Sequence, residues 1–425
     1  MDRQELIREV QRQNKWWDDG QVNLPEPLVK REIEDKLEEE LDEDIITAIT
    51  GLRRAGKTTL LKKMVKTLLE EKKPKNILYF SFDLAEETDI RSVMDIYSEE
   101  ILSQTFENLD QKVYIFLDEV QKLENWSNQI KSIQDRDYNI KFVVTGSAST
   151  NITKGAGESL VGRIMIHRLH TFSFKSYLKY NGIETSEISL EDPSYPSNSQ
   201  ELRIQFNEYM DDGGFPELYD EQSNENLQQN LDLTLFRDIV NLFTVKRSDT
   251  LKQLFRLVTE HTGQVVNYNN LSQDLDTQYR TVTDYLQYLE DGFLINTSKP
   301  VYSNTKKSMR KNPKIYTADH AYNRLYPAKE GLKAETIAYN HLKRIEEPGF
   351  KKDPEVDIIL PEQKKAFEIK YPDKPSRKDA RQLTKLPEDH KLYLVTRKTY
   401  DTWQIKGREV EVIPLWMLCL ATSQK

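Results

Sequence analysis

One segment near the N-terminus carries glycine, lysine and threonine at the spacing of a phosphate-binding loop. It reads Gly51-Leu52-Arg53-Arg54-Ala55-Gly56-Lys57-Thr58, and Thr59 follows it. Such a loop needs glycines so that backbone N–H groups can wrap phosphates, a lysine that reaches the β- and γ-phosphates, and a hydroxyl that binds Mg²⁺. The segment therefore predicts a site for ATP and Mg²⁺, with Lys57 assisting catalysis and Thr58 as a metal ligand.

A second candidate is a pair of carboxylates after the apolar run 113–117. Asp118 and Glu119 follow this predicted strand directly. A buried strand in this position would deliver Asp118 to the Mg²⁺ ion and Glu119 to the attacking water. The alternative is that the pair only caps the helix predicted to begin near Val120.

Two more positions could act on the γ-phosphate. The apolar strand predicted at 142–145 ends in Thr145-Gly146-Ser147, where either hydroxyl could sense the phosphate, and we favour Ser147. A strand that simply ends in a turn is an equal alternative. Arg163 could neutralise the developing charge as an arginine finger, from this chain or a neighbouring one. A surface salt bridge of Arg163 is at least as good an interpretation.

These residues need a scaffold that brings strand ends together. Apolar strands are predicted at 45–49, 77–82, 113–117, 142–145 and 164–169, with helical stretches between them. Such alternation is typical of an α/β fold with a parallel sheet covered on both faces. We therefore expect a P-loop NTPase sheet that holds the candidate residues at one edge.

The segments GLRRAGKTTL, IFLDEVQ, FVVTGSAS, GR, FSFKSYL and GGFPEL carry a resemblance that spans nearly the whole chain. Together they resemble the archaeal and bacterial AAA+-like ATPases, in which a P-loop ATPase precedes a C-terminal domain of uncertain function. The resemblance implies an ATPase with an additional strand and a catalytic glutamate. It thereby supports Glu119 as the base.

The middle of the chain has the apolar spacing of a helix–turn–helix between 271 and 293. Its second helix is predicted to begin near Thr277, with Gln278, Tyr279, Arg280, Thr281 and Thr283 exposed toward a DNA major groove. A winged-helix-like hairpin is expected at 299–318, where the basic residues are Lys299, Lys306, Lys307, Arg310, Lys311 and Lys314. They could contact DNA phosphates. The alternative is a structural lid, because Asp284, Glu290 and Asp291 on the helix would repel phosphates.

The last hundred residues predict a helix at 334–345, strands at 356–360 and 366–371, a helix at 376–386 and a strand at 392–396. On the two neighbouring strands Asp357 and Glu368 could converge on one metal ion, with Lys370 on the same face and Glu335 completing the site. The element order resembles the restriction-endonuclease-like fold, and the residues resemble its PD-(D/E)xK motif. One departure is that Pro354 does not directly precede Asp357. The alternative is two amphipathic strands with their charges in solvent.

The composition limits the kinds of site and the classes of protein that remain possible. The chain has 425 residues, a formal net charge of −9, six histidines and one cysteine, Cys419. These numbers exclude an internal disulfide and a multi-cysteine zinc site, and any nucleic-acid surface must be local. No apolar run resembles a signal peptide or a membrane span, so we expect a cytoplasmic protein without membrane contact.

We therefore expect a helical segment at 1–44, an AAA+-like ATPase domain with its lid at 45–225, a winged-helix-like domain at 226–325 and a nuclease-like domain at 326–425. The leading hypothesis is an Mg²⁺-dependent ATPase that acts as a switch or motor on DNA. The alternative is a regulatory or signalling ATPase with protein partners and a degenerate nuclease fold. A metal-dependent nuclease gated by ATP is a third possibility. Whether the chain forms a homo-oligomer or binds a protein partner stays open.

Overall fold

The computed structural model describes residues 1–83, 88–147, 160–191, 193–219, 223–301, 312–372 and 374–422. The chain divides into two units, Met1–His170 and Thr171–Lys425. This division differs from the boundaries expected at 225 and 325, because both of those positions fall inside the second unit. Within the described ranges, no helix combines the length and the apolar composition that crossing a bilayer requires.

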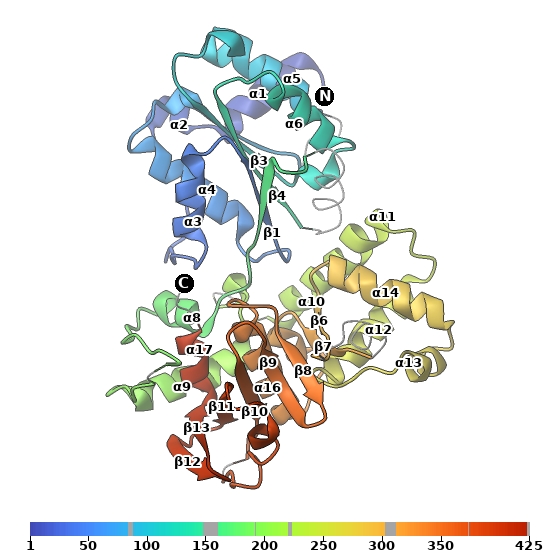
Figure 1. The fold of residues 1–425 in the computed structure, drawn as a ribbon. Coiled ribbons are helices and arrows are strands. Elements are labelled where there is room, and N and C mark those ends of the chain that lie inside the picture. The colour runs from blue at the N-terminus through green and yellow to red at the C-terminus, as the bar shows by residue number, and fades with distance from the viewer. Residues whose placement is uncertain are drawn as a thin grey trace. The chain divides into compact units, whose positions relative to one another are not determined.

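The first unit is built on a parallel sheet, as expected (Figure 1). Its described strands are β1 (Ile46–Thr50), β2 (Ile77–Ser81), β3 (Val113–Asp118), β4 (Ile140–Gly146) and β5 (Ile164–Arg168). They lie in the order β2-β3-β4-β1-β5, and every neighbouring pair is parallel. All five strands therefore end at the same edge, and β4 lies between the strand before the P-loop and the strand that ends in Asp118.

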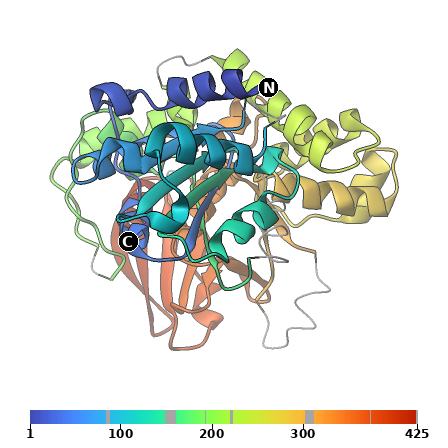
Figure 2. The same cartoon turned by 90° about the horizontal axis from the view of Figure 1, so that it is seen from above.

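Helices cover both faces of this sheet (Figure 1 and Figure 2). Those described are α1 (Arg3–Gln13), α2 (Trp16–Asp19), α3 (Glu34–Glu39), α4 (Lys57–Leu69), α5 (Ile90–Ile96) and α6 (Trp126–Gln134). Side chains alternate along a strand, so each strand contributes to two apolar layers. Ala48 and Phe80 pack in one core with Val10 of α1 and Val93 of α5. The apolar face of α4, which includes Leu61, is buried against β2, β3 and β4.

The second unit contains a mixed sheet in the order β12-β13-β11-β10-β9-β8 among the described residues. Its strands are β8 (Gly349–Lys352), β9 (Glu355–Leu360), β10 (Lys365–Ile369), β11 (Lys391–Thr396), β12 (Asp401–Ile405) and β13 (Arg408–Pro414). The three neighbours β10, β11 and β13 are parallel to one another. One face packs against α8 (Phe174–Tyr180), α9 (Ser199–Asp212), α16 (Glu330–Leu342) and α17 (Leu415–Ala421).

Between α9 and α16 the chain forms further helices and then a hairpin. The helices are α10 (Asn224–Asp232), α11 (Val240–Leu242), α12 (Ser248–Glu260), α13 (Tyr268–Asp274) and α14 (Tyr279–Asp291). The antiparallel strands β6 (Ile295–Ser298) and β7 (Lys314–Thr317) follow α14. This is the element order expected of a winged helix, and the assignment itself stays a prediction. Four of the expected wing residues lie outside the described residues: Lys306, Lys307, Arg310 and Lys311.

One predicted helix, at 376–386, is wrong. The chain forms turns there, followed by a short 3₁₀ helix at Leu383–Lys385. The buried side chains in this stretch are Ala380, Leu383 and Leu386. They recur every three residues, which matches the tighter 3₁₀ turn and not the 3.6-residue period of an α-helix. Leu386 is also followed by Pro387, which disfavours a helical conformation before it.

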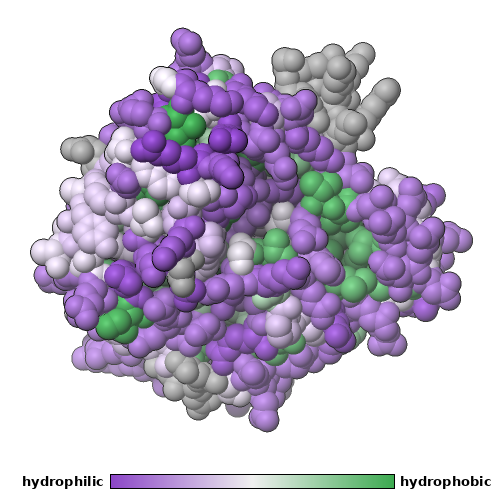
Figure 3. All heavy atoms as spheres, turned by 90° about the horizontal axis from the view of Figure 1, so that it is seen from below, coloured by the Kyte–Doolittle hydropathy of each residue, from purple (hydrophilic) through white to green (hydrophobic). Residues whose placement is uncertain are grey.

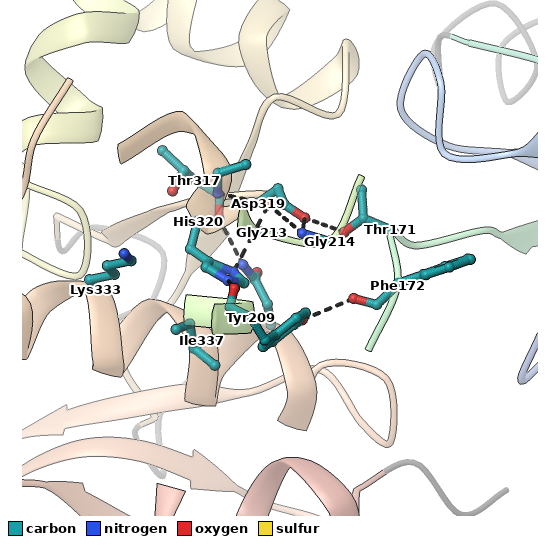
Figure 4. A network of polar contacts seen from close by, with 12 residues as sticks. Thr171, Phe172, Tyr209, Gly213, Gly214, Thr317, Asp319, His320, Lys333 and Ile337 are labelled. Atoms are coloured by element: carbon teal, nitrogen blue, oxygen red, sulfur yellow. Dashed lines mark hydrogen bonds and ion pairs between the residues drawn. The ribbon is translucent and has the colours of Figure 1, made fainter. Parts of the chain in front are cut away.

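A buried carboxylate organises the turn after α9 (Figure 4). Asp319 accepts hydrogen bonds from the backbone N–H of Gly214 at 3.1 Å and of Ala321 at 2.8 Å, and from the hydroxyl of Thr171. A Cβ at Gly214 would lie 2.7 Å from both Asp319 Oδ2 and Phe172 O. The second glycine of the Gly213-Gly214 turn is therefore required by this close approach. The network ties the first residue of the second unit to the rest of that unit.

The face drawn in Figure 3 is mainly hydrophilic, with one larger group of hydrophobic side chains to the right of the centre and smaller ones elsewhere among the described residues. Large hydrophobic side chains that are exposed come from elements far apart in the sequence, such as Ile204 on α9 and Tyr279 on α14. Isolated exposed apolar residues are normal on a folded chain. Polar and charged groups are thus the main features available for recognition on this face.

Candidate functional site

The glycine-rich loop connects β1 to α4 at the carboxyl edge of the first sheet. Gly51 and Gly56 both have positive φ, +149° and +98°. A Cβ at Gly51 would lie 2.3 Å from the carbonyl oxygen of Leu169, so only glycine fits there. The buried Lys57 ammonium donates to the carbonyl oxygens of Gly51 and Leu52, both at 3.0 Å. The loop is therefore closed around its own lysine, with Thr58 exposed at the start of α4.

Asp118 lies against this loop, at the end of β3. Its Oδ2 accepts hydrogen bonds from the Thr58 hydroxyl at 2.7 Å and from the Tyr79 hydroxyl at 2.9 Å. The Thr145 hydroxyl donates to the other carboxylate oxygen. Burial, together with the nearby Asp118 carboxylate, raises the pKa of Tyr79 far above its usual value, so Tyr79 stays a hydrogen-bond donor. The two expected metal-binding residues, Thr58 and Asp118, are thus in direct contact.

Glu119 has a left-handed backbone, φ +58°, and its N–H donates to the Thr145 hydroxyl at 3.1 Å. Its carboxylate accepts from the side-chain amide of Gln121, which also donates to the Ser147 hydroxyl at 3.0 Å. Ser147 itself lies 3.4 Å from Glu119 Oε2. The structure therefore brings Glu119, Ser147 and Thr145 together. Sequence reasoning did not select Gln121, although it stands two residues after Glu119 in the same segment.

Arg31 is a further residue that the sequence did not single out. Its guanidinium donates to the carbonyl oxygen of Ala55, inside the loop, at 2.9 Å, and also to that of His170. The residue is 6% exposed. Arg31 therefore connects the phosphate-binding loop to the last residue of the first unit. No local pattern marks an arginine whose partners lie this far away in the sequence.

Arg163 lies at the other edge of the sheet. It directly precedes β5, whose Ile164 pairs with Ile46 at the start of β1, whereas the loop follows the end of β1. The five residues of β1 span about 16 Å at roughly 3.3 Å each, and the half-exposed Arg163 side chain forms an ion pair with Asp135. Arg163 is therefore out of reach of the loop of its own chain. The finger role within one chain was wrong, and a role toward a neighbouring chain stays a prediction.

The remaining loop residues differ in exposure. Arg54 is exposed and has a left-handed backbone, φ +63°, while Arg53 and Thr59 are half-buried. Ala55 is fully buried and offers its carbonyl oxygen to Arg31. Their expected contacts with a nucleotide stay predictions.

The acidic cluster of the second unit has a different arrangement from the one expected. The ammonium of Lys314, on β7, lies 2.8 Å from Glu335 Oε1 and 3.0 Å from Asp357 Oδ1. Lys370 lies 2.6 Å from Glu368 Oε1 and 3.8 Å from Asp357 Oδ2. Lysine ammonium groups thus stand between the three carboxylates that were expected to converge on one metal ion.

Two expectations are affected by this arrangement. In the part of the chain that the structure describes, no group of three or more His, Cys, Asp or Glu side chains is placed to hold a metal ion. Metal binding by Asp357, Glu368 and Glu335 stays a prediction, because the structure joins these carboxylates through lysines. Lys314 was expected to contact DNA, but its side chain is only 11% exposed because it is held by the carboxylates. Lys299 is exposed.

Burial sets the protonation of this cluster. It raises the pKa of Glu335 to about 7, with the Asp357 carboxylate adding to the effect. The same two causes raise the pKa of Glu368 to about 7. The ammonium groups of Lys314 and Lys370 outweigh the burial of Asp357 and lower its pKa. Glu335 and Glu368 therefore change their charge near neutral pH, whereas Asp357 keeps its negative charge.

Comparison with known proteins matches two segments of the chain to family models. Residues 43–178 match the model described as AAA domain, and residues 203–326 match a domain of unknown function. The first match covers the sheet and the loop described above. Residues 43–178 are therefore similar to AAA domains, and the described part of this segment has the parallel sheet and glycine-rich loop of a P-loop NTPase fold.

The relatives do not reveal a specific activity. An uncharacterized protein of Haemophilus influenzae is 27% identical over 403 residues, which are 89% of this chain and 95% of the relative. An uncharacterized protein of Methanocaldococcus jannaschii is 25% identical over 420 residues, covering 92% of this chain and 90% of the relative. Among solved structures, the Aeropyrum pernix ORC2 protein in its ADP form has a TM-score of 0.36 at 13% identity, covering 76% of this chain and 97% of that one. A likeness at that level supports no conclusion about function.

Proposed function

We propose that this chain binds ATP with Mg²⁺ in the loop 51–58 and hydrolyses it. The observation that carries the proposal is the 2.7 Å hydrogen bond from Thr58 to Asp118, because it joins the end of the loop to the end of β3. These two oxygen-bearing groups are the ligand type that Mg²⁺ prefers. Bound there, Mg²⁺ would neutralise charge on the phosphates.

The residues around this pair have distinct roles in the proposal. Lys57, held at the centre of the loop, supplies a positive charge for the β- and γ-phosphates. Glu119 holds and orients the attacking water and accepts its proton. Ser147 and Gln121 fix the Glu119 carboxylate by the contacts described above. They are positioning residues, because they act through Glu119.

The test is steady-state ATP turnover by the purified full chain with and without Mg²⁺. Lys57→Ala should abolish nucleotide binding and turnover, whereas Glu119→Gln should retain binding and lose turnover by about a hundredfold or more, the usual size of a general-base effect. Matched controls are Lys66→Ala on the exposed face of α4 and Glu124→Gln in an exposed turn. Turnover that is unchanged in Lys57→Ala and Glu119→Gln would refute the proposal.

We also propose that hydrolysis acts as a switch on DNA contacts made by the second unit. Support comes from α14, whose N-terminal positions Tyr279 and Arg280 are exposed while Val282 and Leu286 are buried. A recognition helix is arranged in the same way, with the side chains of its first turn exposed toward the DNA major groove. The regulatory alternative, with a protein partner in place of DNA, makes no use of these side chains.

DNA binding by the full chain, measured at several salt concentrations, distinguishes the DNA hypothesis from the regulatory alternative. The DNA hypothesis expects affinity that falls steeply with salt and that drops in Tyr279→Ala/Arg280→Ala. Arg256→Ala is the control, because Arg256 is exposed on α12 and pairs with Glu260. DNA affinity that is absent, or equal in the double variant and the parent, would favour the regulatory alternative.

A further inference from the structure

The parallel strands of the second unit end beside a cavity. Since β10, β11 and β13 are parallel neighbours, their carboxyl ends meet at one edge. Residues that follow these three ends line a cavity of about 270 Å³, namely Tyr371, Arg397, Lys398 and Trp416. In α/β sheets, ligands bind in the crevice outside the carboxyl ends of the strands. We call this cavity the carboxyl-edge pocket.

Helix α9 forms the rest of the wall. Arg203, Phe206 and Asn207 line the pocket from this helix and lie about one turn apart, so they share one of its faces. Phe206 is buried in the core, whereas Arg203 and Asn207 are exposed. The pocket is therefore open to solvent on the side of the two polar residues.

The pocket is cationic. Arg203, Arg397 and Lys398 line it, and none of its lining residues is acidic. Arg397 lies 5.7 Å from the centre of the Tyr371 ring and 3.6 Å from Glu330, which is outside the lining. In a chain of net charge −9, such a local concentration of positive charge favours an anionic ligand.

The loop that carries two of these cations is fixed by its own hydrogen bonds. The Thr396 hydroxyl donates to the Thr399 carbonyl oxygen at 2.9 Å, and the Thr399 N–H donates to the Thr396 hydroxyl at 3.0 Å. Arg397 and Lys398 stand between these two threonines. Their backbone is therefore positioned before any ligand binds, which lowers the entropy cost of binding.

The pocket also has an aromatic wall. Trp416 and Phe206 line it with side chains that are 1% and 3% exposed. The Tyr195 ring packs edge-on against the indole of Trp416, with ring centres 5.7 Å apart. The cationic side chains therefore stand beside a rigid apolar surface.

We propose that the carboxyl-edge pocket binds the phosphate group of a small phosphorylated molecule. Arg203, Arg397 and Lys398 supply the charge, and Phe206 and Trp416 form the apolar wall. The volume lies near the lower end of the roughly 300–1,000 Å³ that is typical of ligand pockets. It fits a phosphate ester up to about the size of a mononucleotide, and not a polymer. This site is separate from the loop 51–58 and independent of the proposed ATPase.

The test uses the full chain with Lys57→Ala, so that loop 51–58 does not take up the probe. Inorganic phosphate, AMP and a single-stranded oligonucleotide are titrated by calorimetry. We expect saturable binding of phosphate or AMP that is at least about tenfold weaker in Arg203→Ala/Arg397→Ala. Arg377→Ala is the matched control, because Arg377 is exposed on the same unit and outside the lining.

A second variant tests the third cation. Lys398→Ala removes an exposed side chain that lines the pocket, so it should also weaken binding, and circular dichroism checks that it folds. The proposal is overturned if neither phosphate nor AMP saturates, if the double arginine variant binds like its parent, or if only the oligonucleotide binds.

Discussion

Lys314 on β7 donates a 3.0 Å hydrogen bond to Asp357 on β9, and so a lysine occupies the place between carboxylates where a metal ion was expected. The same ammonium contacts Glu335 at 2.8 Å. This contact joins the hairpin to the sheet of the second unit. Lys314 compensates the buried carboxylates, since a buried charge needs a close partner of opposite sign.

Lys314→Met should therefore destabilise the chain by about 3–5 kcal/mol, the usual cost of removing one partner of a buried ion pair. Urea unfolding followed by circular dichroism measures it. Adding Glu335→Gln should restore part of the loss, because it removes one of the two acidic groups that would face each other without Lys314. Lys352→Met, at the exposed end of β8, is the control. An unchanged unfolding midpoint in Lys314→Met would contradict a structural role for the contact.

Glu368 should make stability depend on pH. Burial and the Asp357 carboxylate raise its pKa from 4.5 to about 7, so the folded chain holds this proton more tightly than the unfolded chain. The contribution of Glu368 to the free energy of unfolding is therefore full below about pH 4.5 and falls as pH rises toward 7.

Glu368→Gln removes this titration. The free energy of unfolding of the variant, relative to that of the parent, should rise between pH 5 and pH 8. The rise should be on the order of 1 kcal/mol or more, since a tenfold difference in proton affinity between the folded and unfolded chain corresponds to about 1.4 kcal/mol. Glu362→Gln, at an exposed turn, should show no such change. If Glu368→Gln and the parent differ in free energy of unfolding by the same amount at pH 5 and at pH 8, the pKa of Glu368 is not raised.

Gly214→Ala should destabilise the second unit although Gly214 is not in the left-handed region. The added Cβ would lie 2.7 Å from both Asp319 Oδ2 and the backbone oxygen of Phe172, which accepts a hydrogen bond from the Tyr209 hydroxyl at 2.9 Å. We expect a loss of about 1–3 kcal/mol, typical of overpacking. The control, Gly331→Ala, lies in α16 with nothing near its Cβ, and it should be neutral or stabilising by up to about 1 kcal/mol. Similar thermal midpoints for the two variants would count against the network.

Arg31→Ala should impair the proposed ATPase although Arg31 is not itself one of the expected nucleotide-binding residues. It removes the hydrogen bond to Ala55 in the loop, so we expect kcat/KM for ATP to fall by about tenfold. A fall mainly in kcat would indicate a misaligned loop, and a rise only in KM would indicate weaker binding. Arg91→Ala, exposed on α5, serves as the control. Equal kcat/KM in Arg31→Ala and the parent would exclude a positioning role.

The sequence could predict those features whose residues lie close together in the chain. It could also predict those that follow from the regular geometry of a parallel sheet. The loop 51–58 and the strand before Asp118 follow from short patterns, and a parallel sheet brings their ends together without further information. Arg31, Lys314 and Asp319 acquire their roles from partners far away in the sequence, so no local pattern marks them. The helix predicted at 376–386 was wrong for a different reason. Apolar residues three positions apart fit both a 3₁₀ turn and a short α-helix.

Hydrogen bonds fix the residues on each side of the join between the units. In the first unit, Arg31 donates to the carbonyl oxygen of His170, the last residue of that unit. In the second unit, Arg344 donates to the carbonyl oxygen of Thr171 at 2.8 Å, and Asp319 accepts from the Thr171 hydroxyl. Because Arg31 also donates to Ala55, the end of the first unit and the loop that would hold ATP share one anchor.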